Sequence, residues 1–450
     1  LSHNQLIEGG QGNIDNPIIT SHQMTELSEL RTTLRTAGQS NNNHSWTWVN
    51  EAGGSTSADR GTSIVTDSSG NVFVTGYFSG TSSFGSISLT SNGGEDIFVA
   101  KLQPNGTWLW AVKAGSSGND RANDIEIDTE GNAFLTGYIG LGTATFGSHS
   151  DAHTNTVARG AFVAKIDTNG IWEWVLADHS SGTSSEANGI AIDEDGGLFV
   201  VGIFSGAIVL DNHGPSQTSD SGIYSGFLIK LYSNGTSQFG KKVDSTEGDN
   251  CYFKDVAIDS DGNAYVGGGV QHGECSIGSH TINGPGMEKF VAKLSSTTET
   301  WQWAAEYTDT SWGYVLAITV DHNDNIYVTG KHNNYLFIGK LDSSGSWIWT
   351  ENSVLGVGYD IDVDSSGDLY VTGSFEDTVN FGGTSLTSNG VTDIFVVKLD
   401  SDGNWIRAEK AGGPQTDNGD VNSGTSQFSW YTSNAGITIG SNDAAFVTGW

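Results

Sequence analysis

The stretch IVTDSSGNVFVTG at residues 64–76 decides the fold, because six close variants of it recur along the chain. The variants are IEIDTEGNAFLTG (125–137), IAIDEDGGLFVVG (190–202), VAIDSDGNAYVGG (256–268), ITVDHNDNIYVTG (318–330), IDVDSSGDLYVTG (361–373) and ITIGSNDAAFVTG (437–449). In these copies, β-branched and aromatic residues alternate with small or polar ones on both sides of a turn-forming cluster. The pattern predicts a β-hairpin.

A second hairpin is predicted after six of the seven copies. Its first strand is FVAKL (98–102), FVAKI (162–166), FLIKL (227–231), FVAKL (290–294), FIGKL (337–341) or FVVKL (395–399), and its second is usually a W-x-W strand. Four short antiparallel strands make one propeller blade, and blades must stack to bury their faces. The chain is therefore predicted to be all-β, a seven-bladed β-propeller of four-stranded antiparallel blades anchored at Asp67, Asp128, Asp193, Asp259, Asp321, Asp364 and Gly440.

The predicted propeller spans residues 46–450, and residues 1–45 form a polar N-terminal extension. In that extension Met24, Leu27, Leu30 and Leu34 recur at helical spacing, which predicts one short helix from Met24 to Thr36. We expect the helix to pack on the propeller edge. Assembly with a partner through this extension is the alternative.

The two ends of the chain indicate how the ring closes. Trp46-Thr47-Trp48 matches the fourth strand of a unit, so residues 46–52 are expected to complete the last blade. The seventh unit lacks an FVAKL-like third strand. Either residues 17–20 (PIIT) supply that strand or the chain continues past Trp450, and the second explanation is preferred.

Composition restricts the partners and the compartment. The 52 acidic and 19 basic side chains give a formal charge of −33, which disfavours nucleic acid and anionic membrane surfaces. No apolar run approaches 18 residues, so no membrane span is expected. Hairpin spacing brings Cys251 close to Cys275, and a disulfide there fits an oxidising compartment. We therefore expect an extracellular or cell-surface location.

The repeat resembles the SBBP β-propeller repeat family, whose members are typically secreted or cell-surface proteins. The strongest stretch is VDSSGDLYVTGSFEDTVNFGGTSLTSNGVTDIFVVKLDSDGNWIRA (363–408), and FGSISLTSNGGEDIFVAKL (84–102) follows the same order. The resemblance covers residues 46–450 and implies an extracellular scaffold without a catalytic signature. Unit 5 departs from it by lacking the FG…LTS insertion, and unit 7 lacks its Asp anchor and third strand.

Two repeated polar features are attributed to structure. The DSDGN loops at 259–263 and 400–404 resemble the start of a calcium loop, but Val270 and Ala411 stand where an EF-hand needs its closing Glu. We interpret them as hairpin turns and predict no cofactor and no metal site beyond incidental calcium. The third-strand lysines are expected to pair with the anchor aspartates or to cover the blade edge; they are Lys101, Lys165, Lys230, Lys293, Lys340 and Lys398.

Candidate binding residues come from the exceptions to the repeat. Within unit 5, the link between the second and third strands shrinks to residues 331–335, which predicts a notch there. Among the links between one blade and the next, only those that lead into units 4–7 contain aromatic residues. Exposed rings would stack on sugars, whereas buried rings would wedge between blades. The predicted binding residues are Tyr252, His272, Trp312, Tyr314, Lys331, His332, Asn333, Tyr335, Tyr359, Trp430 and Tyr431.

Three classes of function fit these observations. The first is a binding module for a glycan or a surface protein through the face of blades 4–7. The second is a carbohydrate-active enzyme, either a polysaccharide hydrolase or a lyase, and the third is a structural subunit of a surface assembly. The chain contains no Ser-His-Asp elbow, P-loop or dinucleotide motif, which favours binding or structure over catalysis.

Overall fold

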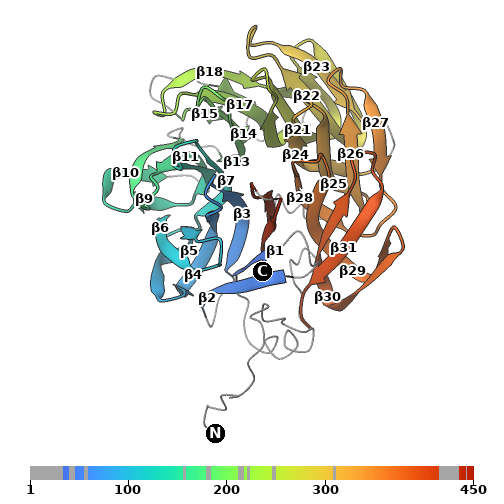
Figure 1. Ribbon diagram of the computed structural model, residues 1–450. Coiled ribbons are helices and arrows are strands. Elements are labelled where there is room, and N and C mark those ends of the chain that lie inside the picture. Colours follow the sequence, from blue (N-terminus) through green and yellow to red (C-terminus); the bar gives the residue numbers. More distant parts are fainter. Residues whose placement is uncertain are drawn as a thin grey trace, which may run out of the picture.

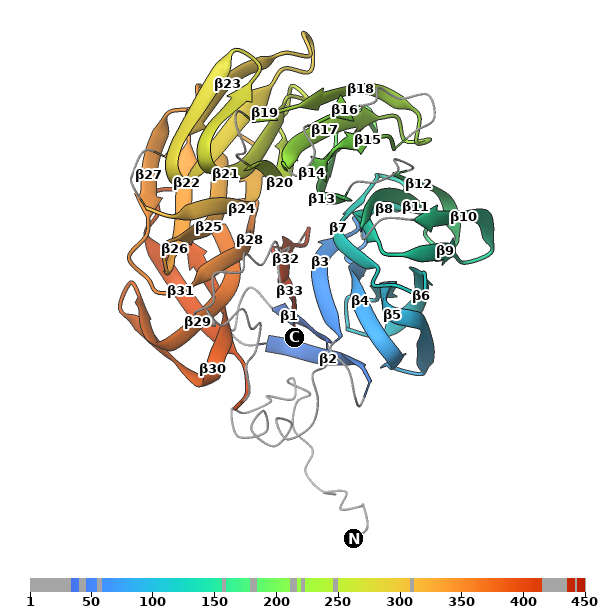
Figure 2. The ribbon, with the colours of Figure 1, turned by 180° about the vertical axis from the view of Figure 1, so that it is seen from behind.

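The computed structural model describes residues 34–39, 46–54, 59–155, 159–178, 184–210, 217–219, 223–245, 250–307, 311–414, 435–441 and 443–449. In these ranges the chain forms strands, turns and loops but no helix, and so no helix that could cross a membrane. The strands form sheets arranged in a ring, as both views show (Figures 1 and 2). The predicted all-β propeller is confirmed.

The first three blades each form from one continuous segment. Blade 1 contains β3 (Arg60–Thr66), β4 (Val72–Phe84), β5 (Ile87–Leu102) and β6 (Trp108–Gly115). Blade 2 contains β7 (Arg121–Ile127), β8 (Ala133–Ile139), β11 (Gly160–Ile166) and β12 (Trp172–Ala177), with β9 (Gly142–Phe146) and β10 (His149–Asn155) in its long loop. Blade 3 contains β13 (Ser184–Ile192), β14 (Leu198–Ser205), β17 (Ser225–Leu231) and β18 (Ser237–Lys242), with the short β15 (Ala207–Ile208) and β16 (Gln217–Thr218).

Blades 4 to 6 follow the same order. Blade 4 contains β20 (Asn250–Ile258), β21 (Ala264–Ile277), β22 (His280–Leu294) and β23 (Trp301–Glu306), and β19 (Asp244–Ser245) pairs with β21. Blade 5 contains β24 (Gly313–Val320), β25 (Ile326–His332), β26 (Tyr335–Leu341) and β27 (Trp347–Glu351). Blade 6 contains β28 (Val357–Val363), β29 (Leu369–Phe381), β30 (Thr384–Leu399) and β31 (Trp405–Ala411).

The prediction of seven blades is wrong, because the described residues form six such blades and the seventh repeat does not build one by itself. Its strands β32 (Gly436–Ile439) and β33 (Ala445–Gly449) pair with β1 (Leu34–Gln39) and β2 (Trp46–Gly53) in the order β32-β33-β1-β2. We call these four strands the closing section. It is continuous with blade 1, since Ala52 of β2 pairs with Phe84 of β4.

Strand β1 corrects two further predictions. It fills the third position of the closing section, where Thr36 pairs with Thr448 on one side and Asn50 on the other. The prediction gave that position to residues 17–20 or to a segment beyond Trp450, and β1 takes it instead. The predicted helix is wrong for its last three residues, because pairing on both strand edges overrides helical spacing; residues 24–33 lie outside the described residues.

The anchor aspartates act in the turns of the repeat, as predicted. The Oδ1 atom of Asp259 accepts the backbone N–H groups of Asp261 and Asn263, and the same pattern recurs in the other blades. Four of the third-strand lysines also form ion pairs with their anchors: Lys101 with Asp67 (3.3 Å), Lys230 with Asp193 (2.7 Å), Lys293 with Asp259 (3.1 Å) and Lys398 with Asp364 (2.9 Å). The repeated polar residues are therefore part of the scaffold.

The second tryptophan of the W-x-W strand links one blade to the next. Its indole N–H donates to a backbone carbonyl in the following blade: Trp48 to Pro104 (2.9 Å), Trp110 to Thr168 (3.1 Å), Trp174 to Ser233 (3.2 Å), Trp303 to Ser343 (3.1 Å) and Trp349 to Ser401 (3.2 Å). A glycine of the contacted turn lies under the ring. At Gly345, whose φ is 85°, an added Cβ would lie 2.8 Å from the Trp303 ring.

In blades 1, 2 and 6 the second strand leads towards a long loop, and a phenylalanine there packs on the fourth strand: Phe84 ends β4, Phe146 ends β9 and Phe381 ends β29. Each packs edge-on against the tryptophan that begins the fourth strand (Trp108, Trp172 or Trp405), with ring centroids 5.3, 5.0 and 5.2 Å apart. Blade 5 lacks this loop, and Tyr307 takes the equivalent place, 5.4 Å from Trp347. Tyr307 therefore packs on Trp347 where the other blades use a phenylalanine, and the notch itself stays a prediction.

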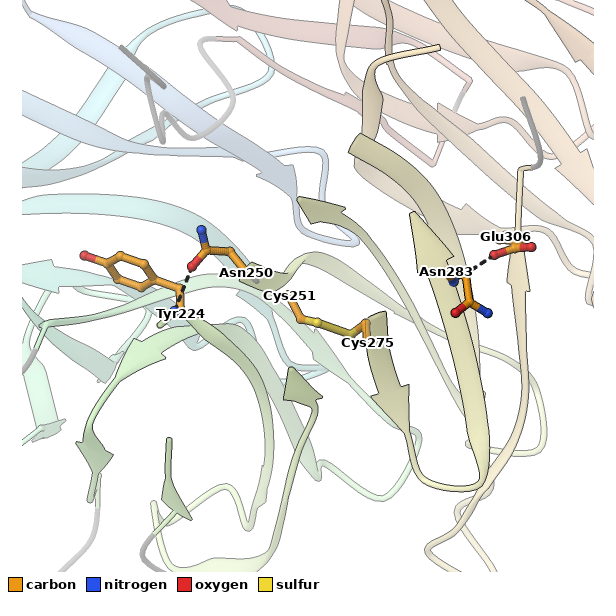
Figure 3. Close-up of a disulfide and its surroundings, with 6 residues drawn as sticks. All are labelled: Tyr224, Asn250, Cys251, Cys275, Asn283 and Glu306. Atoms are coloured by element: carbon orange, nitrogen blue, oxygen red, sulfur yellow. Dashed lines mark hydrogen bonds between the residues drawn. A yellow bond between two sulfur atoms is a disulfide. The ribbon is translucent and has the colours of Figure 1, made fainter. Parts of the chain in front are cut away.

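The predicted disulfide is present between Cys251 and Cys275, with the two Cα atoms 6.0 Å apart (Figure 3). It joins two strands rather than two loops, since Cys251 lies in β20 and Cys275 lies in β21. Cys251 is paired in register with Val270, and a bulge between Gln271 and Gly273 bends β21. Both cysteines are fully buried, so the bond lies inside blade 4.

We predict that Tyr307→Ala lowers the free energy of unfolding by about 2–3 kcal/mol, because it removes a partly buried ring from an aromatic cluster. Tyr307→Phe keeps the ring and should remain close to the wild type. Urea unfolding followed by tryptophan fluorescence measures both. Tyr335→Ala removes an exposed ring of the same blade as a matched control, and equal losses for Tyr307→Ala and this control would contradict the prediction.

Candidate functional site

Several predicted binding residues lie in the core. Tyr252 and Tyr359 are 2% and 5% exposed and pack against residues of neighbouring blades. His332 is 8% exposed and stacks on Phe337 with ring centroids 6.4 Å apart. These three side chains pack in the interior and do not form an exposed surface on which a sugar could stack.

Five further predicted residues differ in how far the structure places them. Tyr314 and Lys331 are partly buried and pair in register across β24 and β25. His272 lies in β21. Trp430 and Tyr431 lie outside the described residues, so their role stays a prediction.

Trp312, Asn333 and Tyr335 come together at the surface of blade 5. Trp312 is 44% exposed and Tyr335 is 38% exposed. The Asn333 backbone N–H donates to the Trp312 carbonyl, and the Trp312 N–H donates to Asn333 Oδ1 at 3.1 Å. Asn333 has a φ of 55°, in the left-handed region that Asn tolerates better than most residues. We call Trp312, Asn333, Asn334, Tyr335 and Leu355 the blade 5 surface.

The segment before blade 6 supports the blade 5 surface. The Asn334 carbonyl accepts the Gly356 N–H at 3.0 Å, and the Leu336 N–H donates to the Val354 carbonyl at 2.8 Å. Between these bonds Tyr335 forms a β-bridge with Leu355, which is 44% exposed. The turn is fixed from both sides, so little conformational entropy would be lost when a ligand binds to it.

A second candidate site is the central channel, a cavity of about 310 Å³. It is lined by the first strand of each blade, which we call the inner strand (β3, β7, β13, β20, β24 and β28), and by β32. Each inner strand of blades 1–6 has a β-bulge at the same position, occupied by Thr62, Asn123, Asn188, Lys254, Leu316 and Tyr359. In blades 1–3 the bulged side chain donates to a carbonyl of the next blade: Thr62 to Ala122 (2.8 Å), Asn123 to Ala187 (2.9 Å) and Asn188 to Phe253 (2.8 Å). The bulges thus join neighbouring inner strands.

The residue after each bulge alternates between aspartate and a small residue around the channel. In order these residues are Ser63, Asp124, Gly189, Asp255, Ala317 and Asp360, followed by Gly436 in β32. The aspartate Oδ2 atoms accept N–H groups from the next inner strand: Ile190 to Asp124 (2.8 Å), Ile318 to Asp255 (2.9 Å) and Ile437 to Asp360 (2.7 Å). A Cβ on Gly189 would lie 2.7 Å from Asp255 Oδ1, so the small residue makes room for the aspartate.

Glu126 and Asp362 add a second level of carboxylates, two residues further along β7 and β28. Burial raises the pKa of Glu126 to about 8, and repulsion from Asp124 adds to this effect. Burial likewise raises the pKa of Asp255 to about 8 and that of Asp362 to about 6. The pKa values of Asp124 and Asp360 are also raised by burial, although backbone N–H groups oppose the effect. The channel therefore holds five carboxyl groups that resist ionisation.

None of these five acids is among the residues predicted from the sequence, although the sequence contains a signal for three of them. Asp124, Asp255 and Asp360 each lie directly after a bulge and four residues before the anchor aspartate of the repeat. At the same position the other copies have Ser, Gly or Ala. Aligning the copies on their anchors shows this alternation. The sequence does not show that this position, four residues before the anchor, faces a channel, because the channel exists only once the ring is closed.

Six four-stranded blades and a closing section around one channel define this chain as a β-propeller repeat protein. Residues 47–80 match the Beta-propeller repeat family (SBBP), so the resemblance recognised from the repeat is confirmed. The chain is also 24% identical over 464 residues to the uncharacterized WD repeat-containing protein L264 of Acanthamoeba polyphaga mimivirus. That alignment covers 88% of this chain but only 30% of the viral protein.

Solved structures similar to this chain share little sequence identity with it. The Dos1 propeller is 11% identical with a TM-score of 0.40, covering 87% of this chain and 92% of that one. Raptor of Chaetomium thermophilum is 9% identical with a TM-score of 0.44, covering 87% and 28%. A protein of unknown function from Bacteroides caccae is 12% identical with a TM-score of 0.40, covering 70% and 90%.

The raised pKa of Glu126 predicts a specific dependence of stability on pH. A carboxyl whose pKa is higher in the folded than in the unfolded chain stabilises the fold at low pH, and this contribution is lost as the pH rises to about 8. Glu126→Gln removes that loss, so it should raise the free energy of unfolding at pH 9 by about 2–4 kcal/mol relative to wild type, with little difference near pH 4.

Urea unfolding between pH 4 and pH 9, in buffer free of divalent cations, measures this effect. Glu130→Gln is the matched control, because Glu130 is exposed on the turn of the same hairpin. Parallel pH profiles for wild type and Glu126→Gln would show that Glu126 ionises normally.

Proposed function

We propose that this protein is a non-enzymatic interaction module that binds a neutral glycan through the blade 5 surface. The observation that carries the proposal is the pair of exposed rings, Trp312 and Tyr335, fixed beside one rigid turn. Sugars present C–H faces that stack on such rings, and an aromatic ring loses little conformational entropy on binding. Propeller folds commonly serve as binding scaffolds, which supports this class of function.

The polar groups of the same turn support a sugar ligand. Asn333 and Asn334 are exposed, and a side-chain amide offers both donors and an acceptor to hydroxyl groups. The formal charge of −33 repels polyanions, so the proposed ligand is uncharged. A neutral polysaccharide meets both conditions.

The proposed location is extracellular or on the cell surface. The Cys251–Cys275 disulfide supports it, since disulfides persist mainly in oxidising compartments. The strongly acidic composition agrees with this setting. Polysaccharides are abundant ligands there.

We predict that Trp312→Ala reduces retention of the protein on a neutral polysaccharide by about tenfold, because one stacking contact is worth roughly 1.4 kcal/mol. Tyr335→Ala should reduce it by a smaller factor. Affinity electrophoresis through gels containing xylan, laminarin or hydroxyethylcellulose measures retention, with alginate as the polyanionic comparison.

Tyr232→Ala is the matched control, because Tyr232 is 54% exposed on the turn between β17 and β18 of blade 3. Its retention should equal that of the wild type. Retention that is unchanged in both blade 5 variants would exclude this surface as the glycan site. Failure of the wild type to be retained on any neutral polysaccharide would instead remove the glycan proposal and leave a protein ligand as the alternative.

A further inference from the structure

A lysine of blade 4 is fully buried where the chain passes from blade 4 to blade 5. Lys289 belongs to β22, and the residue is 0% exposed. Lysine is almost never fully buried unless its ammonium group has partners, because burial removes the water that solvates the charge. The position of the Lys289 ammonium group therefore needs a physical reason, and the contacts around it supply one.

Two aromatic rings contact the ammonium group of Lys289. Its Nζ atom lies 5.3 Å from the centroid of the Tyr307 ring and 5.5 Å from that of the Phe337 ring. Rings at such distances attract a cation through their negative faces. The Tyr307 N–H also donates to the Lys289 carbonyl at 2.9 Å, so both the backbone and the side chain of Lys289 are fixed.

The same ammonium group contacts the backbone on both sides of Trp312. Lys289 Nζ donates to the Ser311 carbonyl at 3.4 Å. An added Cβ on Gly313 would lie 2.9 Å from Lys289 Nζ, so the glycine leaves room for the ammonium group. An ammonium–carbonyl contact is stronger in the protein interior than in water, because the local dielectric is low. Lys289 thus acts on the two residues that flank Trp312.

Trp312 itself is held by both blades. Its backbone N–H and carbonyl are bonded to Asn333 of blade 5. Its ring lies against Gly286 of β22, where an added Cβ would be 3.5 Å from both Cδ1 and Nε1 of the indole. Strand β22 of blade 4 therefore provides both a surface for the Trp312 ring and the buried cation beside the Trp312 backbone.

We propose that Lys289 is the positioning residue of the blade 5 surface: its buried ammonium group fixes residues 311–313 and so presents the exposed Trp312 ring to the ligand. The inference rests on the proposed glycan binding and extends that site from blade 5 into blade 4. Lys289 does not touch the ligand, since it is fully buried. A ring that is fixed before binding loses less conformational entropy when a sugar stacks on it.

Lys289→Met tests the proposal, because methionine keeps an unbranched apolar side chain but removes the ammonium group. Its retention on the neutral polysaccharide that retains the wild type should fall about threefold, since Trp312 is then less well fixed. Lys293→Met is the matched control. Lys293 lies four residues further along β22 and pairs with Asp259 at 3.1 Å, so its loss should leave retention unchanged. Circular dichroism confirms that both variants are folded.

A double-mutant cycle distinguishes positioning of Trp312 from a general loss of structure. If Lys289 acts through Trp312, adding Lys289→Met to Trp312→Ala should change retention by less than about twofold. Equal losses from Lys289→Met in the wild-type and Trp312→Ala backgrounds would overturn the inference. Wild-type retention of the single variant Lys289→Met would overturn it as well.

Fluorine NMR of protein labelled with 5-fluorotryptophan tests the positioning role without a ligand. The Trp312 signal is the one that is missing from the spectrum of Trp312→Phe. In Lys289→Met this signal should shift or broaden, whereas in Lys293→Met it should stay in place. An unchanged Trp312 signal in Lys289→Met would show that Lys289 does not position the ring. Failure of the wild type to be retained on any neutral polysaccharide would instead refute the glycan proposal, and the fluorine spectrum would still decide the role of Lys289.

Discussion

The contact on which the rest of the structure depends is the hydrogen bond from one blade's tryptophan to the turn of the next. A single four-stranded sheet cannot bury both faces, so each blade needs a neighbour at a fixed spacing. The indole N–H of Trp48, Trp110, Trp174, Trp303 or Trp349 provides that spacing, because it reaches one carbonyl beside a glycine that leaves room for the ring. Each bond contributes only about 1 kcal/mol, but its repetition sets the geometry of the ring.

The inner strands also hold neighbouring blades at a fixed spacing, but through aspartate side chains rather than tryptophans. Asp124, Asp255 and Asp360 each accept an N–H group of the next inner strand, and they alternate with small residues around the channel; at Gly189 an added Cβ would lie 2.7 Å from Asp255. Because the acids join strands, they are held in the wall of one channel, where loss of solvent raises their pKa values. The carboxyl groups of the channel are thus a consequence of how the ring is held together, whereas the blade 5 surface results from a departure from the repeat.

Particular residues show how far sequence alone could lead. The hairpins, the anchor turns, four lysine–aspartate pairs and the disulfide follow from local pattern and spacing, and the structure confirms them. Strand β1 could not be found in this way, since its residues carry helical spacing and become a strand only between β33 and β2. Tyr307 is a similar case, because nothing in its local sequence shows that it replaces a phenylalanine missing from another loop.

The sequence by itself determined the propeller, because a hairpin repeat needs only alternating side chains and a turn, both of which are local. It also made Asn333 and Tyr335 candidates through the shortened fifth unit, and Trp312 a candidate through the aromatic residues of the link that leads into unit 5. Only the tertiary structure decided which aromatic rings are exposed, how the ring closes and which acids share a channel. Those properties depend on contacts between residues far apart in the sequence, as between Asp124 and Ile190 or Asp255 and Ile318, and ring closure brings such residues together.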